Sequence, residues 1–383
     1  MPRIRPSTLI KAYQENPLLP LLLKECRTLE SARNELRWLR EHALRTSQTR
    51  QPQTTTPWRT YLSSICRQRS RGYPLQYILG DQPFGDLEIL CRPGVLIPRP
   101  DTESYVLQAA KLVEQIALEK LSGNKEDKED KEDSDTTNVP QSKPLQILDL
   151  CTGTGCITLL LHALLSPRFN LRITGIDISP AALSLARKNL AHNLQAGHLT
   201  HRASTDIKFH RADIMAVNPS SNGTPTIENL LGEYVAAEES DHDHERDQDS
   251  SPRELECDLL ISNPPYISTA DFRNGTTARS VRLFEPRLAL VPAPRPHLTT
   301  TADVRPEDIF YDRILDISYR LRSKVTVLEC GDIQQAERVV SMHTSMAPPA
   351  EFRVQIWPWA EEDMAFYGFH SSGGSRCVII QRV

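Results

Sequence analysis

Apolar residues recur with a helical period in the N-terminal part of the chain. One such stripe consists of Trp58, Tyr61, Leu62, Ile65 and Cys66. Positions three and four residues apart share one face of a helix, so this stripe predicts a helix with Thr56 as its cap and Pro57 at its first position. A similar stripe predicts another helix over residues 31–45. We therefore predict a small helical domain over residues 1–75.

From residue 145 onward, short apolar runs alternate with helical segments. The runs that predict strands are 146–150, 171–176, 206–210, 258–262 and 325–328. Segments with helical stripes, such as 179–193, separate them, and this alternation is typical of a parallel sheet wound by βα units. Two final runs, 352–357 and 376–381, have no obvious helix between them and predict an antiparallel pair. The expected fold class is α/β, a doubly wound, Rossmann-like sheet of seven strands that follows the helical domain.

Three polar segments without apolar periodicity interrupt this pattern and are predicted to be disordered insertions: 122–143, 217–253 and 292–305. Such segments cannot bury enough apolar surface to offset the entropy lost on ordering. They interrupt a large domain predicted over residues 104–383. A connecting segment over residues 76–103 joins that domain to the helical one.

The net charge of −4 has its origin in two acidic segments. Residues 125–133 hold three lysines and six acidic residues, whereas residues 236–254 hold two arginines and eight acidic residues. The rest of the chain carries a net charge of +5, which only weakly indicates nucleic-acid binding. Residues 241–245 mix aspartate, glutamate and histidine, but a polar loop has no fixed neighbours to orient metal ligands. We expect no metal site.

Composition excludes several classes of protein. The 383 residues, of which 39% are hydrophobic, can form two domains with a sizeable core. No run approaches the roughly 20 apolar residues that span a bilayer, so a membrane protein is excluded. The eight cysteines are scattered without a C-x-x-C pair, which argues against zinc sites and a disulfide framework and is typical of a reducing compartment.

A glycine-rich turn follows the first predicted strand of the sheet. The segment reads Leu-Asp-Leu-Cys-Thr-Gly-Thr-Gly, with its glycines at 153 and 155. Glycine lets the backbone bend sharply and approach a ligand closely. Asp177 ends the next predicted strand, where a carboxylate can accept both ribose hydroxyls of a nucleoside. Together these residues predict a nucleoside-containing cofactor.

The details of this turn favour S-adenosylmethionine over a dinucleotide. Thr158 stands where a dinucleotide fingerprint has its third glycine. Asp149, inside the strand, can orient the loop and the amino-acid end of the cofactor. Asp213 follows the strand predicted over 206–210 and can accept a hydrogen bond from the adenine amino group.

The sequence Asn263-Pro264-Pro265-Tyr266 follows the strand predicted over 258–262. Methyl transfer to an amide or aromatic amine is difficult because the nitrogen lone pair is delocalised. A site for it must hold both N–H groups with acceptors and aim the nitrogen at the methyl carbon. The Asn263 side-chain oxygen and the Pro264 carbonyl can be those acceptors, while Tyr266 packs against the plane. Ligands bind at this edge of such sheets, so we predict a catalytic loop here.

These motifs together resemble a known enzyme family. Residues 74–103, which include Ile-Pro-Arg-Pro-Asp-Thr-Glu, the glycine turn, the Asn-Pro-Pro-Tyr loop and residues 284–290 look like the HemK/PrmC-type protein-(glutamine-N5) methyltransferases. The resemblance implies a class I methyltransferase fold and methylation of the GGQ glutamine of class I peptide chain release factors. It implies cofactor contacts from Cys151, Thr152, Gly153, Thr154, Gly155, Asp177 and Asn263. By the same resemblance, the substrate glutamine is received by Asn263, Pro264, Pro265 and Tyr266.

The chain departs from the family pattern at two positions. Cys151 replaces the first glycine of the loop, so the turn must tolerate a side chain there. Ile214 stands where family members often carry an aromatic residue after the acid, so the residue that stacks on adenine is left open.

Two other functions fit parts of the pattern. An adenine-N6 methyltransferase uses the same loop on nucleic acid, but it needs a target-recognition module that this sequence lacks. A non-catalytic cofactor-binding protein in ribosome assembly would not need an intact Asn-Pro-Pro-Tyr loop. The preferred interpretation is a monomeric enzyme that binds a class I release factor, without a membrane partner or a direct nucleic-acid substrate. Basic residues near the N-terminus and the family resemblance favour the mitochondrion, with the cytoplasm as the alternative.

Overall fold

The computed structural model describes residues 4–49, 57–126, 143–216, 223–230, 256–293, 304–358 and 376–383. The chain divides into two compact units. The first consists of Met1–Gln82, Leu90–Ile97 and Ala270–Arg287, and the second of Pro83–Ile89, Pro98–Thr269 and Leu288–Val383. This division differs from the predicted one because a segment that follows the Asn-Pro-Pro-Tyr loop belongs to the first unit. No helix of the described residues combines the length and apolar character that crossing a membrane requires.

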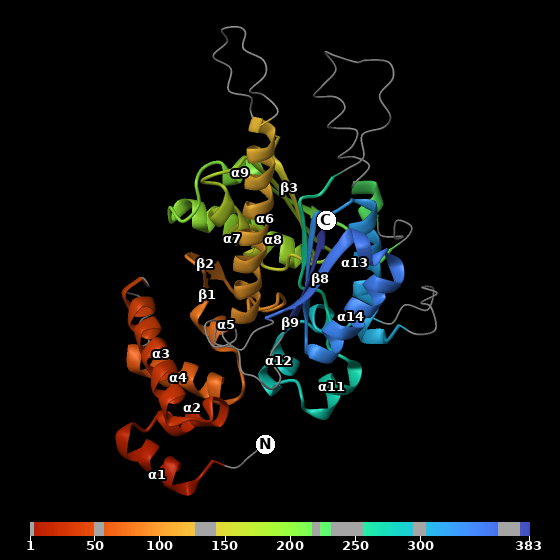
Figure 1. Ribbon diagram of the computed structural model, residues 1–383. Coiled ribbons are helices and arrows are strands. Elements are labelled where there is room, and N and C mark those ends of the chain that lie inside the picture. The colour runs from red at the N-terminus through yellow and green to blue at the C-terminus, as the bar shows by residue number, and fades with distance from the viewer. Residues whose placement is uncertain are drawn as a thin grey trace. The chain divides into compact units, whose positions relative to one another are not determined.

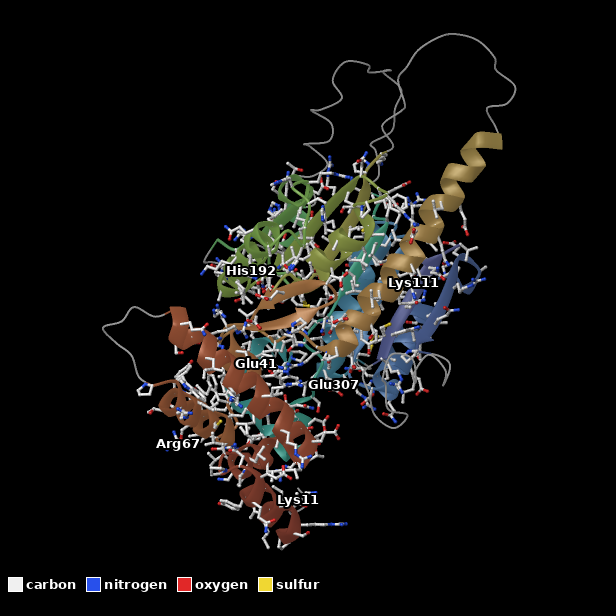
Figure 2. All side chains as sticks on the ribbon, turned by 90° about the vertical axis from the view of Figure 1, so that its left-hand side faces the viewer. Lys11, Glu41, Arg67, Lys111, His192 and Glu307 are labelled. Carbon is white, nitrogen blue, oxygen red and sulfur yellow. The ribbon has the colours of Figure 1, made fainter. Side chains whose placement is uncertain are left out.

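The first unit is helical. Its helices are α1 (Pro6–Glu15), α2 (Leu19–Cys26), α3 (Leu29–Thr49), α4 (Trp58–Ser70), α5 (Leu75–Leu79), α11 (Thr269–Asn274, which begins at the boundary) and α12 (Arg279–Phe284). Its main core is built from small and aliphatic side chains, among them Ala12, Leu22, Leu39, Ala43 and Ile65. Charged residues such as Lys11, Glu41 and Arg67 are exposed (Figure 2).

The predicted helices of this unit are present, with one correction at a helix start. Helix α4 begins at Trp58, and Pro57 is its N-cap residue instead of its first helical residue. Thr56, the predicted cap, lies outside the described residues. The apolar face of α4 still packs as the periodicity requires, and Arg69 pairs with Glu35 of α3 at 2.8 Å between Nε and Oε2.

The second unit contains the predicted seven-stranded sheet (Figure 1). The strands are β3 (Leu145–Leu150), β4 (Leu171–Asp177), β5 (Ile207–Arg211), β6 (Leu259–Ser262), β7 (Val325–Cys330), β8 (Phe352–Trp357) and β9 (Arg376–Arg382). Their order is β5-β4-β3-β6-β7-β9-β8. The first five strands in this order are parallel, and β9 runs antiparallel to both β7 and β8. The structure confirms the expected α/β fold class.

Helices cover both faces of this sheet, because successive strand residues point to opposite sides. Ile147 belongs to a core with α6 (Pro100–Glu126), α7 (Cys156–Leu165) and α8 (Pro180–Gln195). Leu148 belongs to a second core with α13 (Ile309–Arg320) and α14 (Ile333–Met346). Smaller elements are α9 (Ala203–Asp206), η2 (Arg287–Ala289), η3 (Pro306–Asp308) and η4 (Pro349–Glu351). A separate two-stranded sheet consists of β1 (Asp81–Phe84) and β2 (Leu87–Leu90), and a boundary between the units falls within each of these strands.

The predicted insertions are partly ordered, so their boundaries were wrong. Helix α6 continues to Glu126, inside the first predicted insertion. Residues 223–230, inside the second, pack against the sheet: Ile227 and Leu230 are buried in the core beside α13. The two side chains are three residues apart, which places them on one face of a helical turn. The remaining parts, 127–142, 217–222, 231–255 and 294–303, lie outside the described residues, and so does the Asp/His cluster at 241–245.

Candidate active site

Two loops leave the sheet side by side at its carboxyl edge. Strands β3 and β6 are parallel neighbours, and Leu150 lies opposite Ser262 at their ends. The Ser262 hydroxyl donates a hydrogen bond to the Leu150 carbonyl at 2.7 Å. Strand order reverses between these two strands, which is where open α/β sheets bind ligands. The glycine loop, 151–155, and the Asn-Pro-Pro-Tyr loop, 263–266, therefore start next to each other.

Three residues of the glycine loop have a backbone in the left-handed region. The φ angles are +64° at Cys151, +56° at Gly153 and +79° at Gly155. A side chain in this region costs roughly 1–2 kcal/mol, so Cys151 occupies a position that favours glycine. Among the described residues beyond its chain neighbours, a Cβ atom at Gly153 would meet only one atom within 4 Å, the Cys151 carbonyl oxygen at 3.9 Å. The loop thus leaves room for a ligand at Gly153, and the Asn189 amide fixes its far end by donating to the Thr154 carbonyl at 2.9 Å.

Asp149 is a buried carboxylate below this loop. Its Oδ2 accepts hydrogen bonds from the hydroxyls of Thr152 at 2.6 Å and Thr158 at 2.7 Å. Its Oδ1 is buried and has no hydrogen-bond partner within the described part of the chain. Burial raises the pKa of Asp149 to about 7, although the two hydroxyls oppose that shift. An acceptor of this kind fits a cationic or N–H donor group of a ligand.

The raised pKa of Asp149 predicts that the stability of the protein depends on pH in an unusual way. Its folded-state pKa lies above its ordinary value of 3.8, so the stability linked to its protonation is complete below about pH 4 and is lost as the pH rises through 7. Asp149→Asn cannot ionise and should raise the melting temperature at pH 8 by about 5 °C. Scanning calorimetry at pH 4 and pH 8 tests this, because a gain of equal size at both values would contradict it.

Asp177 lies at the end of β4, beside the glycine loop. Its Oδ2 accepts from the Gly153 amide at 2.9 Å, and its Oδ1 accepts from the Ser179 amide at 2.8 Å. Burial raises the pKa of Asp177 despite these bonds. Each carboxylate oxygen can accept a further hydrogen bond, so the side chain can hold two hydroxyl groups.

Asp213 follows β5 and is buried in a turn. Its Oδ1 accepts from the Met215 amide at 3.0 Å, and its backbone pairs with the segment around Thr226. Ile214 is part of the hydrophobic core beside α13. The segment 223–230, which we predicted to be disordered, therefore supports one of the predicted cofactor residues.

The Asn-Pro-Pro-Tyr loop is held by residues from three other segments. Asn263 Nδ2 donates to Thr102 Oγ1 at 3.2 Å, and the Tyr266 hydroxyl donates to Glu329 Oε1 at 3.3 Å. The Gln335 amide donates to the Tyr266 carbonyl at 3.2 Å. Both prolines are buried. These three hydrogen bonds fix the position of the loop.

Sequence reasoning missed Thr102 and Glu329 as members of this site. Thr102 Oγ1 donates to Glu329 Oε2 at 2.7 Å, and both residues are buried. Burial raises the pKa of Glu329 to about 7. The available signals were the Ile-Pro-Arg-Pro-Asp-Thr-Glu motif around Thr102 and an acidic residue inside the apolar run that forms β7.

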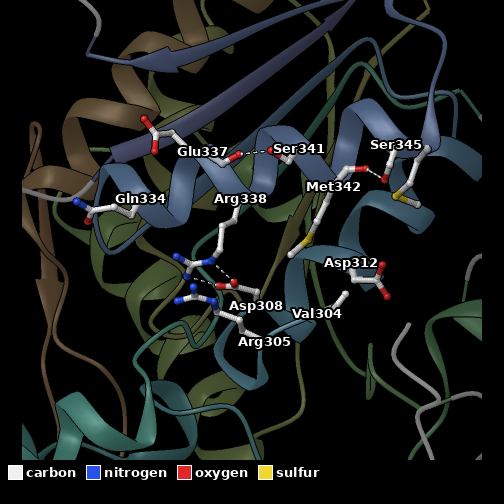
Figure 3. Close-up of a pocket in the computed structure, with 11 residues that line it drawn as sticks. Val304, Arg305, Asp308, Asp312, Gln334, Glu337, Arg338, Ser341, Met342 and Ser345 are labelled. Atoms are coloured by element: carbon white, nitrogen blue, oxygen red, sulfur yellow. Dashed lines mark hydrogen bonds and ion pairs between the residues drawn. The ribbon is translucent and has the colours of Figure 1, made fainter. Parts of the chain in front are cut away.

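A cavity of about 540 Å³ lies elsewhere on the second unit, between η3 and α14 (Figure 3). Arg338 and Asp308 form an ion pair in its wall, with 2.5 Å between Nε and Oδ2. None of the residues that line it is a predicted site residue. We therefore place the candidate active site at the two loops.

Comparisons with known proteins agree with this arrangement. A family model described as "Methyltransferase domain" matches residues 141–223, which include the glycine loop. The chain is 35% identical to the mitochondrial MRF1 N(5)-glutamine methyltransferase MTQ1 of Saccharomyces cerevisiae, over 76% of this chain and 68% of that protein. It is 33% identical to a probable MRF1 mitochondrial N(5)-glutamine methyltransferase of Schizosaccharomyces pombe, over 76% and 73%. A release factor glutamine methyltransferase of Haemophilus influenzae is 30% identical, over 74% and 72%.

Proposed function

Because the chain belongs to the release factor N(5)-glutamine methyltransferase family, we propose that it methylates the GGQ glutamine of a class I peptide chain release factor and so tunes translation termination. The observation that carries this proposal is the Asn263 side chain. Its nitrogen is bound by Thr102, so its oxygen is the end left for a substrate N–H group. Asn263 also directly follows Ser262, which lies opposite Leu150 where β3 and β6 end.

The residues at the glycine loop fit S-adenosylmethionine as the methyl donor. The buried Asp149 Oδ1 can accept from its ammonium group, and Asp177 can accept from its ribose hydroxyls. Cys151, Thr152, Gly153, Thr154 and Gly155 would supply the backbone that holds it, and Asp213 could accept from the adenine amino group. When bound, S-adenosylmethionine supplies an electrophilic methyl group on a cationic sulfur.

The Asn-Pro-Pro-Tyr loop contributes to catalysis by positioning the substrate amide. The Asn263 oxygen and the Pro264 carbonyl accept the two N–H groups of the glutamine amide, while Pro265 stiffens the loop and the Tyr266 ring packs against the amide plane. These contacts would aim the nitrogen at the methyl carbon. As the new N–C bond forms, the bond between the methyl carbon and the sulfur would break with its electron pair left on the sulfur, and the amide would release one N–H proton to water. Alignment of this kind can lower a barrier by several kcal/mol without a general base of unusual pKa.

The substrate and location proposed here are a release factor in the mitochondrion, on which a monomer of this enzyme acts. The support is that the two fungal relatives are named as mitochondrial enzymes for MRF1. Incubation with S-adenosylmethionine and a mitochondrial class I release factor should add one methyl group to the GGQ peptide, as read by mass spectrometry. Methylation of duplex DNA instead would favour the adenine-N6 alternative.

Asp177→Ala should weaken cofactor binding without unfolding the protein. The substitution removes the acceptor for two hydroxyl groups, at about 1.5–3 kcal/mol for each charged hydrogen bond, so the Kd should rise at least tenfold. Titration calorimetry with S-adenosylmethionine measures this change. Glu307→Ala, which alters an acidic residue outside the two loops, is the control and should bind normally. An unchanged Kd for Asp177→Ala would remove this residue from the site.

A further inference from the structure

Three side chains from distant parts of the sequence form a hydrogen-bonded chain behind the catalytic loop. Glu329 on β7 accepts from Thr102 at the start of α6, and Thr102 accepts from Asn263. The sequence separations are 227 and 161 residues. The two distances are 2.7 Å and 3.2 Å, both within hydrogen-bond range.

While Glu329 is ionised, the direction of these bonds is set by what each group can donate. A carboxylate has only acceptor sites, so Glu329 takes the single hydroxyl hydrogen of Thr102. The Thr102 oxygen then offers only lone pairs to Asn263. Only the NH₂ end of an asparagine can bind to lone pairs, so the oxygen end must be turned to the other side.

We propose that Thr102 and Glu329 are positioning residues, which hold the Asn263 amide so that its oxygen, and not its NH₂ group, meets the substrate glutamine. This inference rests on the proposed function, in which Asn263 accepts a substrate N–H group. With the opposite orientation, Asn263 would present a donor to a donor. The glutamine nitrogen would then lose one of its two acceptors and its alignment.

Burial strengthens the hydrogen bonds that orient Asn263. Glu329 is 3% exposed and Thr102 is 3% exposed, so water does not compete for their bonds. The Tyr266 hydroxyl donates to the second oxygen of Glu329, so one carboxylate orients two residues of the loop. Protonation of Glu329 would turn one of its oxygens into a donor and permit the reversed chain, in which Thr102 donates to Asn263.

The groups that act on the Glu329 carboxyl come from several elements. Burial is the main cause that raises its pKa, and Thr102, Tyr266 and Arg99 oppose the shift while Asp101 adds to it. The negative charge of Glu329 also contributes to the raised pKa values of four neighbours: Tyr105 on α6, Cys156 on α7, Cys330 on β7 and Cys377 on β9. Asp149 is a second carboxyl of the site whose pKa is raised to about 7, so the experiment must separate the two.

The test compares Thr102→Val with Thr102→Ser. Valine keeps the shape and removes the hydroxyl, so single-turnover methylation of a saturating release factor should fall about tenfold to a hundredfold. The Kd for S-adenosylmethionine should change much less than the rate, because the glycine loop and Asp177 are untouched. Serine keeps the hydroxyl and should retain most of the rate. A loss with both variants, or with neither, would overturn the positioning role.

The pH profile gives a second readout that a structural role would not produce. The wild-type rate should fall below about pH 7 as Glu329 takes up a proton. In Thr102→Val, the methylation rate should no longer decrease when Glu329 is protonated. Any decrease caused by protonation of Asp149 should remain. Glu329→Gln has nearly the same volume and no charge, so it should fold. Because its amide can either accept from Thr102 or donate to it, the variant no longer imposes one orientation on Asn263, and its rate should be lower than that of wild type and free of the Glu329-dependent change with pH. Profiles identical to wild type in both variants would contradict the proposal.

Methylation of the release factor by the wild-type protein tests the proposed function separately. If wild-type protein does not methylate a release factor, the proposed substrate is wrong whatever the variants do. The orientation of Asn263 is then read by high-resolution crystallography of wild type and Thr102→Val. Retention of the Asn263 orientation and hydrogen bonding in Thr102→Val would overturn the positioning role independently.

Discussion

Asn263→Ala is expected to lower single-turnover methylation of a release factor by two orders of magnitude or more. The substitution removes one of two acceptors for the glutamine N–H groups, which leaves a donor unpaired at about 1–3 kcal/mol. It also lets the nitrogen move from the roughly 3–3.5 Å distance that attack requires, which adds a similar loss. Cofactor binding should fall less, because Asp149, Asp177 and the glycine loop are unchanged.

Rapid-quench kinetics with a folded release factor measures this effect, and titration calorimetry with S-adenosylmethionine measures the binding. Tyr266→Phe is the matched control in the same loop, because it keeps the ring that packs on the amide and removes only the hydroxyl. Its loss should be milder, limited to the 3.3 Å hydrogen bond to Glu329. A wild-type rate for Asn263→Ala would show that the substrate amide is held elsewhere.

Gly175→Val should destabilise the second unit by about 3 kcal/mol or more and disrupt the cofactor loop. Gly175 lies in β4 between Asp149 and Phe209 in the sheet register. A Cβ atom there would come within 2.7 Å of the Phe209 ring and 2.9 Å of Thr152 Oγ1. Neither can move freely, because the ring is buried and Thr152 is bonded to Asp149. Overpacking of this kind commonly costs 1–3 kcal/mol, and a branched residue adds more atoms to the same space.

Thermal unfolding of the variant should show a melting temperature lower by about 5–10 °C. Gly197→Ala is the control. Its φ is +77°, and no atom of the described residues beyond its chain neighbours lies within 4 Å of the added Cβ, so the substitution costs only backbone strain. Phe209→Ala combined with Gly175→Val should cost less than the sum of the two single changes, since it removes the clash. Additive costs would show that the clash with Phe209 is not the cause.

The sequence alone determined the architecture and the position of the two candidate loops in it. The helical stripes, the apolar runs of β3 to β9 and the breaks between them are local patterns, and local periodicity specifies which face of an element is buried. The glycine loop and the Asn-Pro-Pro-Tyr loop were recognisable because each follows an apolar run directly. Sheet topology then requires both at the same edge. The individual roles of Asn263, Asp177 and Asp213 remain predictions for the experiments above.

Only the tertiary structure decided which distant residues support this site. Thr102 and Glu329 are 227 residues apart, and nothing in either local sequence states that they share a hydrogen bond. The same holds for Ile227 and Leu230, whose burial against the sheet was hidden by polar neighbours in the sequence. Their partners depend on the order of the strands and on which helix covers each face. Such contacts join segments that periodicity describes one at a time, so they exist only once the whole sheet is assembled.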